Sequence, residues 1–492
     1  MRTYISSRGG EKIQGAASAI IQGIASDKGL FVPTEIPKLA CSLESLANMK
    51  YKDVAKMIIG AFFDDYTDEE IAKSVENAYD SKFDTEDVVP VVKAGDVWFL
   101  ELYHGKTSAF KDMALSILPY LLTTAVKKIK EDKKICILTA TSGDTGKAAL
   151  EGFTDVSDTE IIVFFPEDGV SAVQKAQMIT QTGENTHVFA IRGNFDDAQT
   201  GVKRIFNDDE MKSKLAARGY RLSSANSINI GRLVPQIAYY VYGYGKLVKA
   251  GEISAGDTIN IVVPTGNFGN ILAAYYASLM GIPVHRFICA SNENKVLTDF
   301  INTGVYDTRR EFHITTSPSM DILISSNLER LLYHLSGGDS DEIANLMQCL
   351  EEKKHYEVNT GIKDGLKRFY GGFADMKETD KAIGRMYAGA NYLMDTHTAV
   401  AYKVYEDYRS ETGDETPSII ASTASPFKFA RSVARAVGLA ECEDEFSYLQ
   451  ELSQATGLVI PKGLSDLDKK EIRHRDVIDI SQMCASVEAV LR

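Results

Sequence analysis

Short apolar runs, each followed by a loop of small polar residues and then by an amphipathic stretch, recur from residue 96 onward. This order predicts strand–loop–helix units. Runs that are apolar throughout are typical of parallel strands covered by helices on both faces, and ligands of such sheets bind at the carboxyl ends of the strands. The runs begin at Val97 (VWFLEL), Ile135 (ICILT), Ile161 (IIVFF), Ile259 (INIVV), Val284 (VHRFIC) and Ser418 (SIIAS). The pattern therefore predicts an α/β fold with a mostly parallel sheet.

Apolar residues at helical spacing dominate the rest of the chain. Residues 1–95 contain three such stretches, EKIQGAASAIIQGIAS, YKDVAKMIIGAFF and TDEEIAKSVENAYDSKF, and are predicted to form a helical cap. Residues 339–390 are charged and helical in pattern without a clear strand, and residues 441–492 are similar, so we expect both to be peripheral. Because 492 residues exceed the needs of one core, residues 96–492 are expected to form two α/β lobes around a cleft.

The composition of the chain disfavours several classes of protein. The chain has 54 basic and 68 acidic residues, and this net charge of −14 disfavours a nucleic-acid or anionic-membrane partner. No run of apolar residues is long enough to span a membrane, and the first residues lack the apolar core of a secretory signal, so a cytoplasmic protein is expected. The cysteines show no CxxC pair, which favours reduced thiols and no metal site. They are Cys41, Cys136, Cys289, Cys349, Cys442 and Cys484.

Two glycine-containing loops follow predicted strands and precede helices. They are TATSGDTGKAAL, residues 139–150, and PTGNFGNILAAYYA, residues 264–277. Free backbone N–H groups and the positive end of a helix dipole can bind an anion at such turns. Each loop taken alone is equally consistent with a plain turn whose glycines serve packing. Neither has the spacing of a dinucleotide-binding loop, and Ala148 stands where a P-loop needs Ser or Thr, so NAD and nucleoside triphosphates are disfavoured.

Lys111, in HGKTSAFKDMAL, stands at the start of a predicted helix. Its position alone favours a solvated lysine. Two anion-binding loops of the same sheet would, however, meet at one cleft beside it. Beside Phe110, Ala109 and Met113, and near a positive helix end, the pKa of a lysine falls and its amine becomes a nucleophile toward a carbonyl. Schiff-base chemistry at Lys111 is therefore the hypothesis.

Eight stretches form a distinctive series along the chain: RGGEKIQGAASAIIQGIASDKGLFVP, HGKTSAFKD, ATSGDTG, SANSINIGRLVPQIAYY, PTGNFGN, TSPSMDI, DTHTAVAY and STASPFKF. In this order they resemble the threonine synthases, pyridoxal-phosphate enzymes of fold type II, and the likeness extends over nearly the whole chain. The resemblance implies two open, twisted, mostly parallel sheet lobes around a cleft, with the N-terminal region as a cap. It also implies pyridoxal 5'-phosphate as the cofactor.

The resemblance further implies roles for single residues. Lys111 would form the Schiff base with the cofactor and serve as acid and base. Asp144 would lie near the ring hydroxyl and Thr423 would face the ring nitrogen. The loop matching the cofactor-phosphate site consists of Gly266, Asn267, Phe268, Gly269 and Asn270. Many relatives have asparagine at the position of Asp144, so the protonation of that contact stays open.

The implied reaction is the last step of threonine biosynthesis, in which a carbon–oxygen lyase converts O-phospho-L-homoserine and water to L-threonine and phosphate. The loop of Ser142, Gly143 and Thr145 would receive the substrate carboxylate, together with Asp144. Candidates for the substrate phosphate are Ser227, Asn229 and Arg232. Arg232 suits phosphate best because its planar fork matches phosphate oxygens. A structural arginine is equally consistent with the sequence.

Two positions depart from the family pattern: Lys106 often corresponds to proline, and Ser425 often corresponds to histidine. A solvated Lys106 is favoured, and no role in proton transfer carries over to Ser425. His104 and His397 are more often structural than catalytic at such positions. The alternative functions are a threonine synthase-like phospho-lyase releasing 2-oxobutyrate, another fold type II lyase or dehydratase, and a catalytically silent cofactor-binding subunit. A monomer or a homodimer is expected.

Overall fold

The computed structural model describes residues 1–141, 143–168 and 170–492. Its larger sheet has six strands in the order β14-β11-β10-β15-β5-β4, and all neighbouring pairs are parallel except β4 with β5. Strand β4 therefore forms an antiparallel edge. The strands are β14 (Phe369–Phe373), β11 (Val284–Ser291), β10 (Ile259–Pro264), β15 (Ser418–Ser422), β5 (Val97–Glu101) and β4 (Val91–Ala94).

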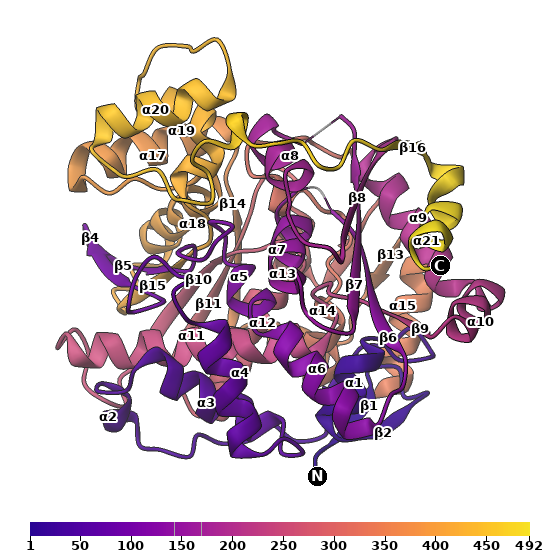
Figure 1. Ribbon diagram of the computed structural model, residues 1–492. Helices are drawn as coiled ribbons and strands as arrows, with labels where there is room; N and C mark the ends of the chain where they lie inside the picture. Colours follow the sequence, from indigo (N-terminus) through magenta and orange to yellow (C-terminus); the bar gives the residue numbers. More distant parts are fainter. Residues whose placement is uncertain (142, 169) are drawn as a thin grey trace.

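The second sheet has five strands, all parallel, in the order β16-β8-β7-β6-β9. They are β16 (Val477–Asp479), β8 (Thr186–Arg192), β7 (Thr159–Pro166), β6 (Lys134–Ala140) and β9 (Tyr220–Ser223). All six predicted strands are therefore confirmed, and they are divided between two sheets. Figure 1 shows the two sheets as separate lobes, the larger with β10 and β11 and the smaller with β6 and β7.

Alternate residues of each central strand enter different cores. In β6, Ile135 and Ile137 pack into the core that also holds the N-terminal region, whereas Cys136 and Leu138 face α9 (Phe195–Asn207) and α21 (Met483–Val490). In β15, Ile419 packs into the core that holds the N-terminal region, and Ile420 packs into a separate core on the other face of the sheet. Both faces of each sheet are thus buried, which explains the continuous apolar runs.

Helices cover both faces of the larger sheet. On one side α18 (Thr396–Thr412) contacts β10, β11, β14 and β15, with α17 (Met376–Ala390), α19 (Ala430–Ala436) and α20 (Glu445–Thr456) outside it. On the other side lie α12 (Gly269–Met280) and α11 (Ile230–Lys249), which runs beneath the sheet in Figure 1. Nearly every residue of α11 is buried, as expected for a helix enclosed on all sides.

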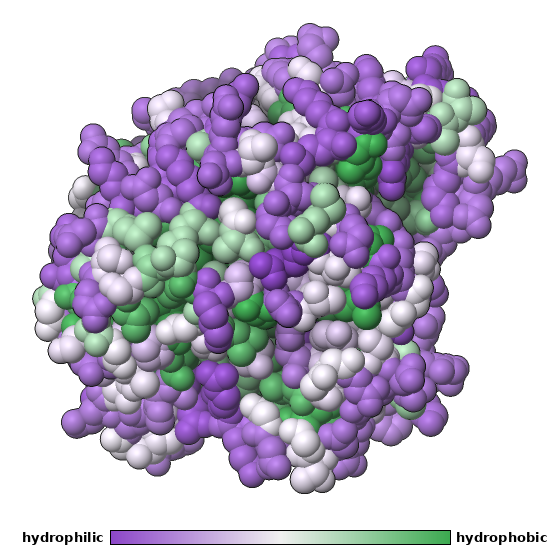
Figure 2. Space-filling model, turned by 90° about the horizontal axis from the view of Figure 1, so that it is seen from below, coloured by the Kyte–Doolittle hydropathy of each residue, from purple (hydrophilic) through white to green (hydrophobic). Residues whose placement is uncertain are grey.

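The N-terminal region packs below α11 but is only partly helical. Its helices are α1 (Ala16–Gln22), α2 (Leu43–Leu46), α3 (Tyr51–Phe62) and α4 (Asp68–Ala78). The prediction of a purely helical cap is wrong, because β1 (Thr3–Ser6), β2 (Lys12–Gln14) and β3 (Phe31–Pro33) form an antiparallel sheet. These strands are three or four residues long and gain their stability from pairing with one another. Figure 2 views this side of the molecule and shows a mostly hydrophilic surface with patches of hydrophobic side chains.

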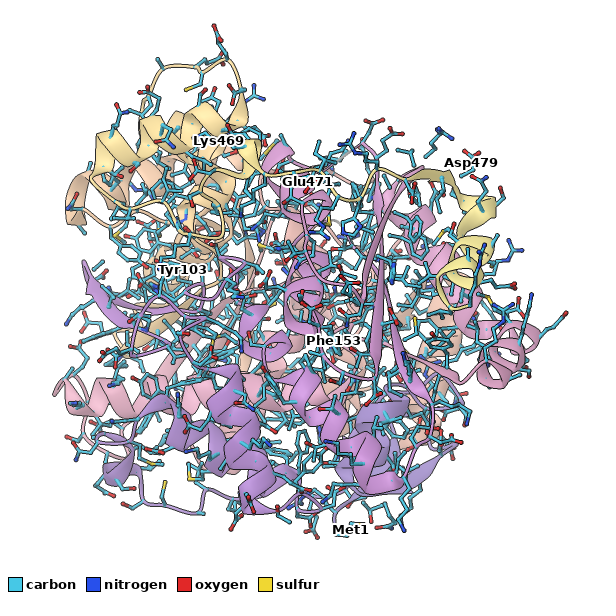
Figure 3. The ribbon with its side chains drawn as sticks, in the orientation of Figure 1. Met1, Tyr103, Phe153, Lys469, Glu471 and Asp479 are labelled. Carbon is cyan, nitrogen blue, oxygen red and sulfur yellow. The ribbon has the colours of Figure 1, made fainter. Side chains whose placement is uncertain are left out.

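Two segments expected to lack strands contain them. Within residues 339–390, β14 pairs with β11 at the edge of the larger sheet, and β13 (His355–Glu357) pairs with β12 (Val305–Asp307) in a separate antiparallel two-stranded sheet. Within residues 441–492, β16 pairs with β8. Figure 3 shows the second segment crossing the top of the molecule from Lys469 through Glu471 to Asp479. The N–H groups of Arg473 and His474 donate to the Ile179 carbonyl on the way. One segment is therefore part of the larger sheet, and the other is part of the smaller sheet.

The remaining elements connect these layers. They are α5 (Asp112–Leu115), α6 (Leu118–Ile129), α7 (Asp144–Phe153), α8 (Ala172–Ile179), α10 (Asp209–Ala217), α13 (Val296–Thr303), α14 (Leu328–Leu335), α15 (Ser340–Lys353), α16 (Thr360–Leu366), β12 (Val305–Asp307), β13 (His355–Glu357), and the 3-10 turns η1 (Pro318–Met320), η2 (Pro426–Phe429), η3 (Leu467–Lys469) and η4 (Ile480–Gln482). Within the described ranges, no helix has the length and apolar character needed to cross a membrane.

Candidate active site

Lys111 directs its side chain into the protein. It precedes α5, is 9% exposed, and places Nζ 3.0 Å from Ser319 Oγ and 3.4 Å from Asp144 Oδ2. Burial lowers the pKa of its amine; the Asp144 carboxylate opposes this effect, and the charges of Lys428 and Arg232 add to it. The amine is therefore more readily deprotonated than that of a surface lysine.

A short ladder of backbone hydrogen bonds fixes the segment that carries Lys111. The N–H of Phe110 donates to the Thr423 carbonyl at 2.8 Å, and the N–H of Ser425 donates to the Ser108 carbonyl at 3.0 Å. Between them, Ala109 and Ala424 form an isolated antiparallel bridge. The residues that follow β5 are thus bound to those that follow β15, at the carboxyl edge of the larger sheet.

Asp144 begins α7 and is surrounded by hydrogen-bond donors. Its Oδ1 accepts from Lys428 Nζ and Gln174 Nε2, both at 2.9 Å, and its Oδ2 accepts from Ser319 Oγ at 3.1 Å and from Lys111. Burial would raise the pKa of this carboxyl, but Lys428, Lys111 and Gln174 hold it well below its usual range. Asp144 is therefore a carboxylate at neutral pH.

The loop from Gly266 to Asn270 leads into α12 with its backbone N–H groups free. Phe268 has a φ of 63°, in the left-handed region, and Gly269 is the first residue of the helix. Among the described residues, the N–H groups of Gly266, Asn267 and Phe268 have no hydrogen-bond acceptor. The loop is held from outside, because Asn327 donates twice to the Asn267 carbonyl. This arrangement can bind an anion.

Three of the residues expected to flank the cofactor and the substrate carboxylate, Asp144, Thr145 and Thr423, line one cavity. Thr423 is 4% exposed, and its N–H donates to Thr398 Oγ1. Thr145 and Asp144 contribute from the start of α7, and Gly143 immediately precedes that helix with a φ of 136°. Ser142 lies outside the described residues.

Arg232 is a buried cation that pairs with no acidic side chain among the described residues. It is 3% exposed, and its Nη1 donates to the Ala225 carbonyl at 2.9 Å. Within the described chain, no carboxylate pairs with it and its Nε has no acceptor. Burial lowers the pKa of this guanidinium group to about 10. An unpaired buried charge is costly, so the site favours an anion that enters from outside.

The two other phosphate candidates differ in position. Ser227 lines the cavity, and its Oγ accepts from Asn327 Nδ2 at 3.2 Å. Asn229 caps α11 instead: its Oδ1 accepts from the Gly231 N–H, and its Nδ2 donates to the carbonyls of Ile20 and Ser224. The structure therefore brings Ser227 and Arg232 to the cavity but uses the Asn229 side chain elsewhere.

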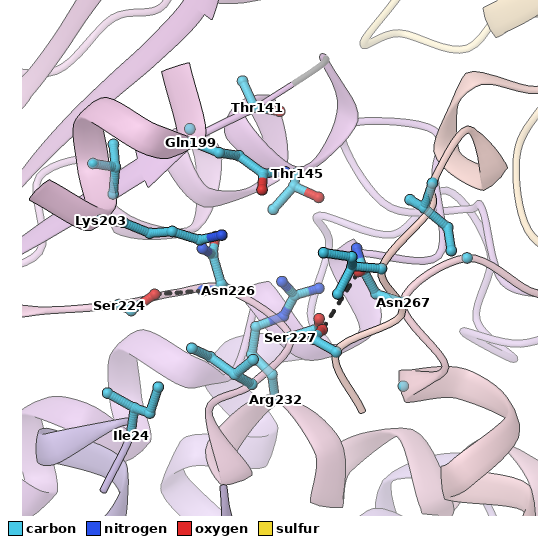
Figure 4. A pocket seen from close by; sticks show the side chains of 18 of the residues that line it. Ile24, Thr141, Thr145, Gln199, Lys203, Ser224, Asn226, Ser227, Arg232 and Asn267 are labelled. Atoms are coloured by element: carbon cyan, nitrogen blue, oxygen red, sulfur yellow. Dashed lines mark hydrogen bonds between the residues drawn. The ribbon is translucent and has the colours of Figure 1, made fainter. Parts of the chain in front are cut away.

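These groups share one cavity of about 1740 Å³ between the lobes. Figure 4 shows Thr145, Lys203, Ser227, Arg232 and Asn267 pointing toward a common space. Lys111 and Thr423 line the same cavity. Lys111 and Arg232 thus bring two basic groups to this cavity, and Arg232 has no carboxylate partner among the described residues, so the cavity can hold a ligand with more than one anionic end.

Comparisons with known proteins agree with this geometry. Three family models match successive parts of the chain: the threonine synthase N terminus at residues 3–79, the pyridoxal-phosphate dependent enzymes at 88–360, and the threonine synthase C-terminal region at 398–489. The threonine synthase of Eremothecium gossypii is 34% identical over 503 residues, covering 96% of this chain and 94% of that protein. The chain belongs to the threonine synthase family.

Other members of the threonine synthase family show how far the likeness extends. A pyridoxal-phosphate-bound threonine synthase from Brucella melitensis has a TM-score of 0.88 at 32% identity, covering 100% of this chain and 99% of that one. Human threonine synthase-like 1 is 41% identical over 444 residues, which are 88% of this chain and 59% of that protein. The chain thus spans about three-fifths of the length of this human relative.

Three site residues were not predicted from the sequence: Ser319, Gln174 and Lys428. Ser319 and Lys428 lie within family motifs, TSPSMDI and STASPFKF, but nothing in either motif marks the single residue as a contact of Asp144. His397 supports Ser319, since its Nε2 accepts from the Ser319 N–H at 3.2 Å and its Nδ1 lies 3.0 Å from Asp395 Oδ1. In this family member the imidazole is therefore a buried support for the turn beside Lys111.

Lys106 and Ser425, which depart from the family pattern, and His104 all form contacts with nearby residues. Lys106 is 48% exposed and pairs with Glu151 at 2.8 Å. Ser425 caps η2 by accepting from the Phe427 N–H at 3.4 Å. His104 lies 2.6 Å from Asp84 Oδ1 through Nδ1 and 2.9 Å from Glu101 Oε2 through Nε2. All three side chains are engaged in local structure.

Proposed function

We propose that this protein is a threonine synthase that converts O-phospho-L-homoserine and water to L-threonine and phosphate, using pyridoxal phosphate. One observation carries the proposal. Among the described residues, one cavity is lined by the buried amine of Lys111, by a loop whose backbone N–H groups lack an acceptor, and by Arg232, whose guanidinium group lacks a carboxylate partner. The cofactor and the substrate each bring a phosphate, and the cavity has a cationic or N–H-rich feature for each.

The residues of the cavity fit pyridoxal phosphate. Lys111 would hold its aldehyde carbon and the loop of residues 266–270 its phosphate, while Asp144 would face the ring hydroxyl and Thr423 the ring nitrogen. Because Asp144 is ionised, it can accept a hydrogen bond there but not donate one. When bound, the cofactor supplies an electron sink for the negative charge that develops on the substrate.

Lys111 is the proposed acid and base of the reaction. Its lowered pKa leaves more of the amine unprotonated near neutral pH, and only the unprotonated amine attacks a carbonyl or accepts a proton. In the proposed sequence Lys111 removes the proton from Cα and then assists loss of a proton from Cβ. Phosphate leaves from Cγ, a proton is added at Cγ, water adds its hydroxyl at Cβ, and a proton returns to Cα to give L-threonine. Ser319 Oγ accepts from the amine and keeps it in place between these transfers.

The two ends of the substrate are assigned to opposite parts of the cavity. We assign its phosphate to Arg232 and Ser227, because Arg232 offers a charged fork without a competing carboxylate. We assign its carboxylate to the start of α7, where Gly143 and Thr145 lie and where the N-terminal end of a helix favours an anion. Ser142 belongs to the same loop. Asn229 is left out of this assignment because its amide caps α11.

Product analysis tests the proposal. The purified protein, loaded with pyridoxal phosphate, is incubated with O-phospho-L-homoserine, and threonine, 2-oxobutyrate and phosphate are measured. Equal amounts of threonine and phosphate are expected. Release of 2-oxobutyrate in place of threonine would identify the phospho-lyase, and absence of phosphate release would overturn both functions. The variant Lys111→Ala serves as the control for phosphate release without catalysis.

The partners and compartment follow from charge and thiols. With a net charge of −14, we propose a small-molecule substrate and no nucleic-acid or membrane partner. All six cysteines are free thiols, which suits a reducing compartment, so we propose the cytoplasm. We propose a monomer or homodimer, and sedimentation analysis would distinguish the two.

A further inference from the structure

Lys428 is a fully buried lysine that the proposed chemistry leaves without a role. It is 1% exposed, and its ammonium group makes two contacts: Asp144 Oδ1 at 2.9 Å and the Thr107 carbonyl at 2.8 Å. Removing an ammonium ion from water is costly unless a partner and further hydrogen bonds compensate. A methionine of similar length could fill the same space without that cost, so packing alone does not account for a charge here.

The backbone holds Lys428 and Lys111 on opposite sides of Asp144. Lys428 lies in η2, and its N–H donates to the Ser425 carbonyl at 3.0 Å. Ser425 belongs to the ladder that joins residues 107–110 to residues 423–425 and thereby fixes Lys111. One local structure therefore sets the positions of both ammonium groups relative to the carboxylate.

The groups that surround Lys111 and Lys428 lie on different elements of the structure. Lys111 Nζ faces Asp144 from α7 and Ser319 from η1, and the charge of Arg232 from α11 also acts on it. Lys428 faces Asp144 and, less directly, Asp112 of α5. Burial raises the pKa of Asp112 to about 6, even though Thr107 donates to both of its oxygens.

We propose that Lys428 is a positioning residue of the active site, whose ammonium group holds the carboxylate of Asp144 aligned toward the amine of Lys111. The proposal rests on the assignment of Lys111 as the residue that binds the cofactor. Asp144 and Lys428 form a fixed pair of opposite charges, and this pair keeps its charge while the nitrogen of Lys111 gains and loses protons. The carboxylate then accepts hydrogen bonds throughout and does not compete with Lys111 for a proton.

The proposal predicts the direction of two opposite shifts. Removal of the Lys428 charge takes a cation away from the neighbourhood of the Lys111 nitrogen, so the pKa of that nitrogen rises. Removal of the Asp144 charge takes an anion away, so the pKa falls. Charges within 4–6 Å typically shift a pKa by about 1–3 units. When both charges are removed, the two effects largely cancel.

The visible absorbance of the protein loaded with pyridoxal phosphate, measured against pH, tests this directly. The midpoint of its pH titration is expected to rise by about one unit or more in Lys428→Met and to fall in Asp144→Asn. It should return close to that of the unaltered protein in the double variant. Lys147→Met is the matched control: Lys147 is a lysine on α7 whose side chain is 11% exposed, but it pairs with Glu151 at 3.1 Å. Its removal should leave the midpoint unchanged.

The outcomes separate this proposal from the proposed function. If the loaded, folded Lys428→Met variant has an unchanged midpoint, Lys428 has no positioning role, whatever product the enzyme makes. Should Lys428→Met fail to fold because it leaves Asp144 unpaired, the double variant is compared with Asp144→Asn alone, and equal midpoints overturn the proposal. An unaltered protein that forms no lysine-dependent colour with pyridoxal phosphate overturns the proposed function and this proposal with it.

Discussion

Gly266 lies directly against the backbone of Ser319: a Cβ atom on Gly266 would be 2.3 Å from the Ser319 carbonyl oxygen. Ser319 contacts Lys111 Nζ through its hydroxyl and His397 through its N–H. The loop after β10 and the turn that supports the reactive amine therefore pack without room for a side chain. Such a contact couples the anion-binding loop to the position of Lys111.

Gly266→Ala is expected to weaken pyridoxal phosphate binding by at least about tenfold and to lower the free energy of unfolding by about 1–3 kcal/mol, because backbone must move to admit the methyl group. Gly269→Ala is the matched control, since its Cβ would meet nothing closer than 3.6 Å. Cofactor titration and urea unfolding measure both effects. Equal behaviour of the two variants would contradict the close packing.

Lys111→Ala is expected to lose the visible absorbance that borohydride discharges, because no other amine would bind the cofactor aldehyde. The rate of phosphate release should fall by about 10²–10⁴-fold, the usual contribution of a positioned acid–base group. Lys106→Ala provides the comparison, since Lys106 is 48% exposed and pairs only with Glu151. Retention of colour in Lys111→Ala would place the cofactor on another residue.

Arg232→Met is expected to reduce kcat/KM for the phosphorylated substrate by about 10²-fold or more, the loss typical of a buried charge pair left without one partner. The free energy of unfolding should stay the same or increase, because the variant removes a buried cation that has no carboxylate partner within the described chain. Arg435→Met, at a side chain 56% exposed and paired with Asp380, should change neither. A stable Arg232→Met variant with unaltered kcat/KM would exclude Arg232 from the phosphate site.

His104 makes part of the stability depend on pH. Burial would lower the pKa of its imidazole, but Asp84 and Glu101 raise it to about 9. Since the pKa is higher in the folded than in the unfolded chain, this stabilisation is complete below about pH 6.5 and is lost as the pH rises through 9. The difference in free energy of unfolding between the unaltered protein and His104→Gln should shrink by about 2–3 kcal/mol over that interval. Urea unfolding at several pH values checks this, and a constant difference would contradict it.

The sequence predicts the central strands well because both faces of each sheet are buried. In β6, Ile135 and Ile137 serve one core and Cys136 and Leu138 serve another, so no polar residue interrupts the run. The edge strand β14 contains Gly371 and Gly372, which weaken the apolar pattern. Gly371 is close-packed, since its Cβ would lie 2.9 Å from the Thr298 carbonyl oxygen. That contact is set by tertiary packing, so the pattern of residues near β14 does not indicate it.

The site, like the fold, could be predicted from the sequence only in part. A lysine beside small and apolar residues, together with loops after strands, is enough to predict that Lys111 and the loop of residues 266–270 line one cavity. The expectation that both loops follow strands of the same sheet is wrong, because β6 and β10 belong to different sheets that face this cavity. The partners of Asp144 are not predictable by such reasoning, because Gln174, Ser319 and Lys428 reach it from three separate parts of the chain. Asn229 shows the opposite error. Its residue type is suited to binding a phosphate, but its side-chain amide caps a helix instead.

Strand β16 closes one edge of the five-stranded sheet by pairing with β8, and the paired residues Arg192 and Asp479 are 287 positions apart in the chain. During synthesis, β8 leaves the ribosome long before its neighbour exists. Until then its outer row of N–H and C=O groups is open to pairing with another nascent chain. The smaller lobe therefore cannot complete its sheet until residue 479 has been synthesised, and the yield of active protein in cells should depend on how well chaperones shield that edge in the meantime.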